Sequence, residues 1–175
     1  DVYGGTYRLL NTIYNDRFEI KHINTTDIES VKSELNSFKP DLVWIESPTN
    51  PMLQISDIKA ICNSAHIVGA KVVVDNTFMS PYFQNPLDLG ADMVMHSLTK
   101  YINGHSDVVG GAIMLNDCAQ YEKLWYLQNS IGPSQSPFDS WLVLRGVKTL
   151  SVRMRTHEDN AINIANFLTE HPNVE

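Results

Sequence analysis

Basic residues are scarce in this chain, which carries 13 lysines and arginines against 20 aspartates and glutamates, for a net charge of −7. A nucleic-acid-binding domain normally shows a basic patch or stripe, and here the basic residues are scattered, so we expect no nucleic-acid partner. No apolar run approaches the length of a membrane span, and no signal peptide is recognisable. We therefore expect no membrane partner and a cytoplasmic location.

Cysteine is also scarce, and several common site motifs are missing. Cys62 and Cys118 are far apart and lack metal-ligand spacing, so we predict two reduced, buried thiols. The six histidines show no HxxxH or comparable pairing, which predicts no metal site. The chain has no G-x-G-x-x-G sequence, P-loop or nucleophile elbow. Their absence disfavours dinucleotide binding, ATP binding and Ser-His-Asp hydrolysis.

Short, continuous apolar runs are present, and they predict the fold class. Such runs are typical of strands covered on both faces, so we predict an α/β fold with a mostly parallel sheet flanked by helices. Two amphipathic helices are expected between the strands, one opened by a capping box at Thr26 and one closed by Gly69. The predicted strands cover residues 18–24, 42–45, 72–74, 93–95 and 108–115.

Polar residues follow these strands directly. Glu46, Asp75 and His96 each come just after an apolar run. Open α/β sheets bind ligands beyond the carboxyl ends of their strands, so we expect the functional site at this edge.

Lys100 is the candidate that selects a cofactor. Most lysines are solvated surface residues, and alone Lys100 would be interpreted in that way. Its neighbours Ser97, Thr99 and Gly104 supply two hydroxyls and a permissive backbone, and Asp75 closes an upstream strand. A lysine that forms a Schiff base, an aspartate that keeps a pyridine nitrogen protonated and hydroxyls for a phosphate are what pyridoxal 5'-phosphate requires. As an alternative, Asp75 is a turn residue or a helix cap.

Two further residues fit the same cofactor, each with a simpler alternative. The Asn50 side-chain amide could donate to the ring's phenolate oxygen, or Asn50 could form only an Asn-Pro turn. Tyr3, beside two glycines, could lay its ring on a planar cofactor, or it could be a buried aromatic residue in a turn.

Together these segments resemble the Cys/Met-metabolism family of pyridoxal-phosphate enzymes, the trans-sulfuration group of fold type I. The resemblance extends over essentially the whole chain and implies the three-layer α/β/α large domain of that fold. The segments that carry it are residues 1–6, 46–51, 74–78, 97–107, 127–130, 136–139 and 144–150.

The resemblance implies two catalytic residues and their partner. Lys100 would hold the cofactor aldehyde as a Schiff base and then act as the mobile base. Tyr3 would stack on the ring and assist proton transfer, and Asp75 would pair with the pyridine nitrogen.

The remaining implied cofactor contacts are polar side chains. Asn50 would contact the phenolate oxygen, Ser97 and Thr99 would bind the phosphate, and Thr77 would complete the set.

The implied substrate is a small sulfur amino acid. Gly5 stands where methionine γ-lyases of the family carry a cysteine, which weighs against that activity. Residues 75–83 and 127–130 are most similar to the γ-lyases that cleave L-cystathionine by α,γ-elimination to cysteine, 2-oxobutanoate and ammonia. The γ-synthase and β-lyase activities, or a non-catalytic relative, remain alternatives.

The resemblance also bears on organisation. Residues 1–175 would form most of the cofactor-binding large domain, with an N-terminal segment and a C-terminal small domain lying outside this sequence. We expect little or no turnover from these residues alone, and a homotetramer built as a dimer of dimers.

Overall fold

The computed structural model describes residues 2–174; Asp1 and Glu175, which bound the predicted domain, lie outside the described residues. The chain forms two compact units. The first comprises Asp1–His96 with Gly111–Ser134, and the second comprises Ser97–Gly110 with Gln135–Glu175.

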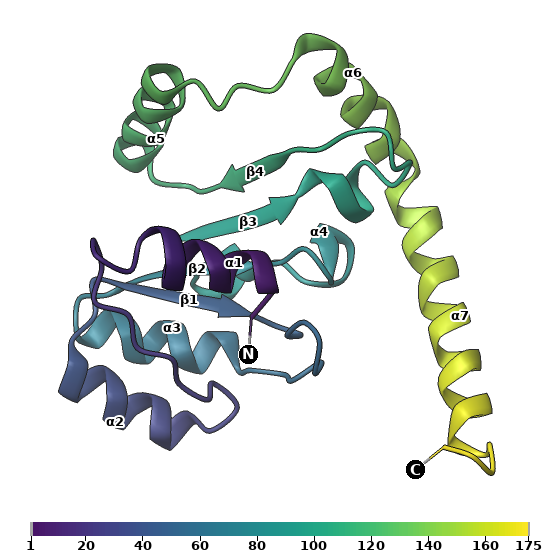
Figure 1. The fold of residues 1–175 in the computed structure, drawn as a ribbon, viewed down its shortest axis with the longest axis horizontal. Coiled ribbons are helices and arrows are strands. Elements are labelled where there is room, and N and C mark those ends of the chain that lie inside the picture. The colour runs from purple at the N-terminus through teal and green to yellow at the C-terminus, as the bar shows by residue number, and fades with distance from the viewer. Residues whose placement is uncertain (1, 175) are drawn as a thin grey trace. The chain divides into compact units, whose positions relative to one another are not determined.

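The first unit is built on one four-stranded sheet in the order β1-β2-β3-β4. β2 pairs in parallel with both β1 and β3, and β4 runs opposite to β3 (Figure 1). The predicted α/β class with a mostly parallel sheet is therefore confirmed. The strands are β1 (Leu42–Glu46), β2 (Lys71–Asp75), β3 (Met93–Ser97) and β4 (Gly111–Met114).

The helices of the first unit supply its core. Val31 and Leu35 of α2 and Ile61 of α3 are buried in one cluster with Ile45 of β1 and Val74 of β2. Each such side chain contributes about 1.5–3 kcal/mol of hydrophobic stabilisation, so this cluster holds the helices to the strands. The helical segments are α1 (Gly4–Arg8), η1 (Leu9–Ile13), α2 (Ile28–Phe38), α3 (Ile58–Ile67), α4 (Ser80–Phe83), η2 (Pro86–Leu89) and α5 (Cys118–Ile131).

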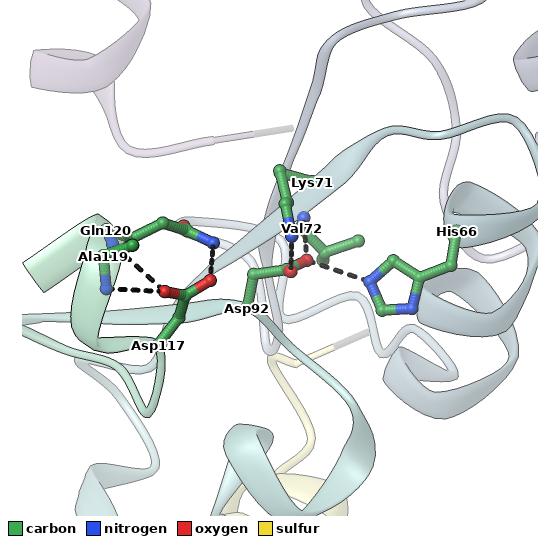
Figure 2. A network of polar contacts seen from close by, with 7 residues as sticks. All are labelled: His66, Lys71, Val72, Asp92, Asp117, Ala119 and Gln120. Carbon is green, nitrogen blue, oxygen red and sulfur yellow. Dashed lines mark hydrogen bonds and ion pairs between the residues drawn. The ribbon is translucent and has the colours of Figure 1, made fainter.

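A polar network fastens the amino ends of β2 and β3, and Asp92 is its centre (Figure 2). The Asp92 carboxylate accepts hydrogen bonds from Lys71 Nζ at 2.8 Å, the Val72 amide at 2.8 Å and His66 Nε2 at 2.9 Å. Burial raises the pKa of Asp92, but these hydrogen bonds, led by that from Lys71, outweigh burial and hold it below its ordinary value. The network lies at the opposite end of the strands from the carboxyl edge, so its role is structural.

The second unit contains the lysine-bearing turn and the last helices. The turn is η3 (Leu98–Ile102), and α6 and α7 both pack against it. Ser136 caps α6 by accepting a hydrogen bond from the Asp139 amide at 3.0 Å. The other elements of this unit are α6 (Pro137–Gly146), η4 (Val147–Thr149) and α7 (Leu150–Thr169).

No helix among residues 2–174 is long and apolar enough to cross a membrane.

Two strand predictions need correction. Residues 18–24 form no strand, because this segment lies outside the sheet and uses its side chains elsewhere: Ile23 packs on the core and Lys21 pairs with Glu34. The predicted strand over residues 108–115 is shorter, because Gly110 bonds instead to the lysine-bearing turn, where its carbonyl accepts from the Leu98 amide at 2.9 Å.

The capping and cysteine predictions were each half right. Helix α2 begins where expected, but its cap is Asp27, whose carboxylate accepts from the Glu29 and Ser30 amides at 3.1 and 3.2 Å, and not Thr26. Cys62 is a buried free thiol as predicted, and its burial raises its pKa to about 11. Cys118 is exposed, because it begins α5, a helix that buries none of its residues.

Candidate functional site

The carboxyl edge of the sheet places two acidic residues next to each other. Glu46 ends β1, Asp75 ends β2, and the two are register partners in the parallel pair. Each is buried, with 7% of its surface exposed. Two buried carboxylates on neighbouring strands are costly unless other groups compensate their charge, and this is the edge at which such sheets bind ligands.

Asp75 is held by Thr77. Its Oδ1 accepts from the Thr77 amide at 3.0 Å and from the Thr77 hydroxyl at 2.6 Å. Both bonds end on Oδ1, so the second oxygen takes no part in them. Burial raises the pKa of Asp75 and outweighs the lowering effect of both bonds. A carboxylate in this state gains from a cationic partner such as a protonated pyridine nitrogen.

Glu46 ties two of the predicted cofactor contacts to the sheet. Its Oε2 accepts from the backbone amide of Tyr3 at 2.8 Å, and its Oε1 accepts from the backbone amide of Asn50 at 2.7 Å. Burial raises the pKa of Glu46 most, these two bonds lower it, and the charge of Asp75 raises it further. A single side chain therefore links the segment at Tyr3, the loop at Asn50 and the edge that carries Asp75.

Tyr3 lies against Gly5, which explains the glycine beside it. A Cβ added at Gly5 would stand 2.5 Å from Tyr3 Cε1. Real Cβ atoms essentially never approach so closely, so a side chain at Gly5 would displace the ring. Tyr3 is 48% exposed, so the predicted alternative of a buried aromatic residue does not apply.

Lys100 lies in the second unit, within the η3 turn that follows β3. Its backbone angles, φ −98° and ψ −126°, are not helical, so the turn is kinked at the lysine itself. The side chain is exposed. Gly104, four residues later, has φ +73°, a left-handed conformation that favours glycine. This conformation agrees with the prediction that Gly104 permits a tight turn of the backbone.

The two predicted phosphate ligands lie at the start of this turn, Ser97 just before it and Thr99 within it. Thr99 Oγ1 accepts from the Gly110 amide at 3.1 Å and lies 3.4 Å from the Gly110 carbonyl oxygen. A hydroxyl has one proton to donate, so Thr99 would bind a phosphate oxygen by turning that proton away from the Gly110 carbonyl, while its oxygen keeps the bond from the Gly110 amide. Ser97 is the last residue of β3 and is half-buried.

His96 precedes this turn and has no charge to offer a ligand. It is buried, and burial lowers its pKa to about 4, so it is neutral at physiological pH. Within the part of the chain that the structure describes, no group of three or more His, Cys, Asp and Glu side chains could hold a metal ion.

The predicted site residues therefore form two groups, one in each unit. The first unit joins Tyr3 and Asn50 through Glu46 and fixes Asp75 through Thr77. The second unit carries the phosphate and Schiff-base candidates Ser97, Thr99 and Lys100. In chemical type these groups fit pyridoxal phosphate: a desolvated carboxylate, an exposed amine and hydroxyls beside a glycine turn.

Sequence reasoning gave no role to two residues that organise these groups. Glu46 accepts hydrogen bonds from the backbone amides of Tyr3 and Asn50. The sequence feature that could have identified it is its position at the end of a strand, equivalent to that of Asp75. Arg153 of α7 binds the backbone of the Lys100 turn. That role had no local sequence signal, because the partners lie about fifty positions apart.

Comparisons with known proteins agree with this chemistry. The cystathionine gamma-lyase of Dictyostelium discoideum is 56% identical over 177 residues, covering 100% of this chain and 45% of the relative. The probable cystathionine gamma-synthase of Herpetosiphon aurantiacus is also 56% identical, covering 100% of this chain and 55% of the relative. The chain thus spans about half the length of the curated relatives it matches.

Solved structures and a family model extend the match. The crystal structure of metB from Corynebacterium glutamicum superposes with a TM-score of 0.95 at 50% identity, covering 100% of this chain and 46% of that one. The cystathionine gamma-lyase of Lactobacillus plantarum, complexed with L-serine, gives a TM-score of 0.93 at 43% identity, covering 98% of this chain and 45% of that one. The model of the Cys/Met metabolism PLP-dependent enzymes matches residues 1–175. The chain belongs to the Cys/Met metabolism family of pyridoxal-phosphate-dependent enzymes.

Proposed function

We propose that the protein containing this chain is a trans-sulfuration carbon–sulfur lyase that cleaves L-cystathionine by α,γ-elimination, giving cysteine, 2-oxobutanoate and ammonia. The main support for the proposal is the environment of Asp75 in a chain of a pyridoxal-phosphate-dependent family. The Asp75 carboxylate is buried at the carboxyl end of β2, and its pKa is raised. Such a carboxylate is suited to hold a proton on a ring nitrogen.

When bound, pyridoxal phosphate supplies the electron sink for bond breaking at the substrate α-carbon. Lys100 anchors it through Nζ and later accepts the α-proton on that same atom. Asp75 keeps the ring nitrogen protonated, and Thr77 fixes the direction of the Asp75 carboxylate through its two bonds to Oδ1.

Four other residues position the cofactor in this proposal. Tyr3 stacks on the ring and assists proton transfer, and Asn50 contacts the phenolate oxygen. Ser97 and Thr99 hold the phosphate. Lys100 serves at more than one step, so its loss should harm activity far more than the loss of one phosphate contact.

Two observations bear on which reaction is catalysed. Gly5 leaves no room for the cysteine of methionine γ-lyases unless the Tyr3 ring moves, because a Cβ there meets that ring at 2.5 Å. The γ-synthase is the second candidate, because a probable γ-synthase is as similar to this chain as a γ-lyase is, at 56% identity each.

Product analysis of the complete protein separates the candidates. With L-cystathionine, a γ-lyase gives 2-oxobutanoate and cysteine, whereas a β-lyase gives homocysteine and pyruvate. A γ-synthase forms cystathionine from cysteine and a homoserine ester. If none of these products appears while the cofactor is bound, the protein is a non-catalytic relative and the proposed activity is wrong.

The proposal includes organisation and location. Residues 1–175 form most of the cofactor-binding large domain of a cytoplasmic homotetramer built as a dimer of dimers. The exposed aromatic residues Tyr121, Trp125 and Tyr126 of α5 support subunit contacts, because that helix buries none of its residues in the chain. Sedimentation of the complete protein tests the assembly, and a monomer would contradict it.

A further inference from the structure

The Lys100 turn presents a row of backbone carbonyls at its carboxyl end. The Leu98 carbonyl accepts from the Asn103 amide at 3.2 Å, and the Lys100 carbonyl accepts from the Gly104 amide at 2.8 Å. The carbonyls that end a helical turn generally need partners from outside the helix. In this turn they are those of Tyr101 and Ile102.

Arg153 of α7 supplies the missing donors. Its Nη1 donates to the Tyr101 carbonyl at 2.7 Å, and its Nη2 lies 3.3 Å from the Ile102 carbonyl and donates to the Gly146 carbonyl at 3.1 Å. Its Nε donates to Thr149 Oγ1 at 3.0 Å. One guanidinium therefore joins the turn after Lys100 to the end of α6 and the start of α7.

The surrounding backbone is shaped to admit this side chain. A Cβ on Gly104 would lie 2.2 Å from Arg153 Nη1, so the guanidinium occupies the space that a side chain at Gly104 would need. A Cβ on Gly146 would lie 2.3 Å from the Asn103 carbonyl oxygen, so the end of α6 also approaches the turn closely. Burial lowers the pKa of Arg153 from its ordinary value, but a guanidinium stays charged at neutral pH, and its hydrogen bonds are charge-assisted.

We propose that Arg153 is a positioning residue for Lys100: it holds the carboxyl end of the lysine-bearing turn closed and so fixes where the Lys100 amine can reach the cofactor aldehyde. This inference rests on the role proposed above for Lys100. The fork of the guanidinium is required, because two neighbouring carbonyls are bound at once, and a single ammonium cannot reproduce that geometry.

The test compares Arg153→Met and Arg153→Lys with the wild-type complete protein. Arg155→Met is the matched control, because Arg155 is exposed on the same helix. The first measurement is amide hydrogen exchange of residues 97–104 in cofactor-free protein. Loss of the charge-assisted bonds should speed exchange of this segment about tenfold or more in Arg153→Met, less in Arg153→Lys, and not in the control.

The second measurement is the Schiff-base absorbance band formed with pyridoxal phosphate, followed for its rate of appearance and its midpoint on pH titration. We expect about tenfold slower formation and a shifted midpoint in Arg153→Met, with partial recovery in Arg153→Lys. If the Arg153 hydrogen bonds only stabilised the fold, a folded variant would keep both the rate of band formation and the midpoint of its pH titration.

Each outcome decides the proposal. Wild-type exchange of residues 97–104 in Arg153→Met would overturn it, and so would faster exchange with an unchanged band. If Arg153→Met does not fold, Arg153→Lys decides, and wild-type behaviour in both measurements overturns it. A wild-type protein that forms no band at all would refute the proposed function instead, while the exchange comparison would still test the Arg153 tie.

Discussion

Replacing Asp75 by asparagine should move stability and activity in opposite directions. The change keeps Oδ1, which accepts both hydrogen bonds from Thr77, and removes the charge. Bonds to a neutral acceptor are weaker by about 1 kcal/mol each, so the two together lose about 2 kcal/mol. Burial raises the pKa of Asp75 by more than the two bonds lower it. The stability gained by no longer burying a charge should therefore exceed the stability lost from the weaker bonds. We expect cofactor-free Asp75→Asn to be more stable than wild type at pH 7.

The pH dependence gives this prediction its sign. A carboxyl whose pKa is raised by folding stabilises the fold fully below its ordinary value, here 3.8, and that stability is lost as the pH rises through the folded value. The advantage of Asp75→Asn should therefore be present at neutral pH and absent below the ordinary pKa. Activity should fall, because an opposite charge at contact distance is worth about 4 kcal/mol at an effective dielectric constant of 20, or about a thousandfold in kcat/KM.

Thermal unfolding of the cofactor-free protein from pH 3 to pH 8, with steady-state kinetics of the loaded protein, measures both effects. Asp117→Asn is the matched control, because hydrogen bonds from Gln120 and Ala119 lower the pKa of Asp117 at the start of α5, so its charge is favourable there. That control should be less stable than wild type at pH 7. Asp75→Asn that is less stable than wild type at pH 7, or that keeps kcat/KM within tenfold, would refute the reasoning.

Three further substitutions test other parts of the structure. Asp92→Asn should lower the free energy of unfolding by about 2 kcal/mol at pH 7, because it removes charge from the network with Lys71. The pKa of Asp92 is lowered in the folded protein, so this difference should shrink as the pH falls below the ordinary value of 3.8 and be lost as the pH falls through the lowered value; a difference constant with pH would contradict it. Gly5→Ala should displace the ring of Tyr3 and raise the dissociation constant for pyridoxal phosphate about tenfold with little effect on thermal stability, whereas unchanged binding would show that the ring lies elsewhere. Glu46→Gln keeps one acceptor oxygen for two amides, so crystallography of the variant should show the segment at Tyr3 or the loop at Asn50 displaced; an unmoved pair would rule out the proposed anchor.

The sheet was largely predictable because its strands are nearly continuous apolar runs. β1, β2 and β3 lie where the sequence placed them, since strands covered on both faces need apolar residues at successive positions. Residues 18–24 misled because a local pattern cannot show whether a partner strand exists. Asp27 displaced Thr26 as the helix cap for a similar reason: both side chains can accept, and the backbone decides which one reaches the first amides.

The residues that support the site were not predicted, and the roles of Asp75 and Lys100 stay predictions. Those two roles rest on chemistry that is uncommon in such positions and on the agreement of the neighbouring motifs. Glu46 was missed because its bond from Tyr3 spans 43 positions, and Arg153 was missed because its bonds to the Lys100 turn span 52 and 51 positions. No local spacing encodes such contacts. Residues that hold a site in place therefore became visible only with the fold.

The central claim is that Lys100 forms the bond to pyridoxal phosphate, and one measurement tests it most directly. The absorption spectrum of the complete protein with pyridoxal phosphate should show a Schiff-base band that is absent in Lys100→Ala. Borohydride reduction of the wild-type complex should leave the cofactor attached to the peptide that contains Lys100. A band that persists in Lys100→Ala, or a label on another lysine, would contradict the account.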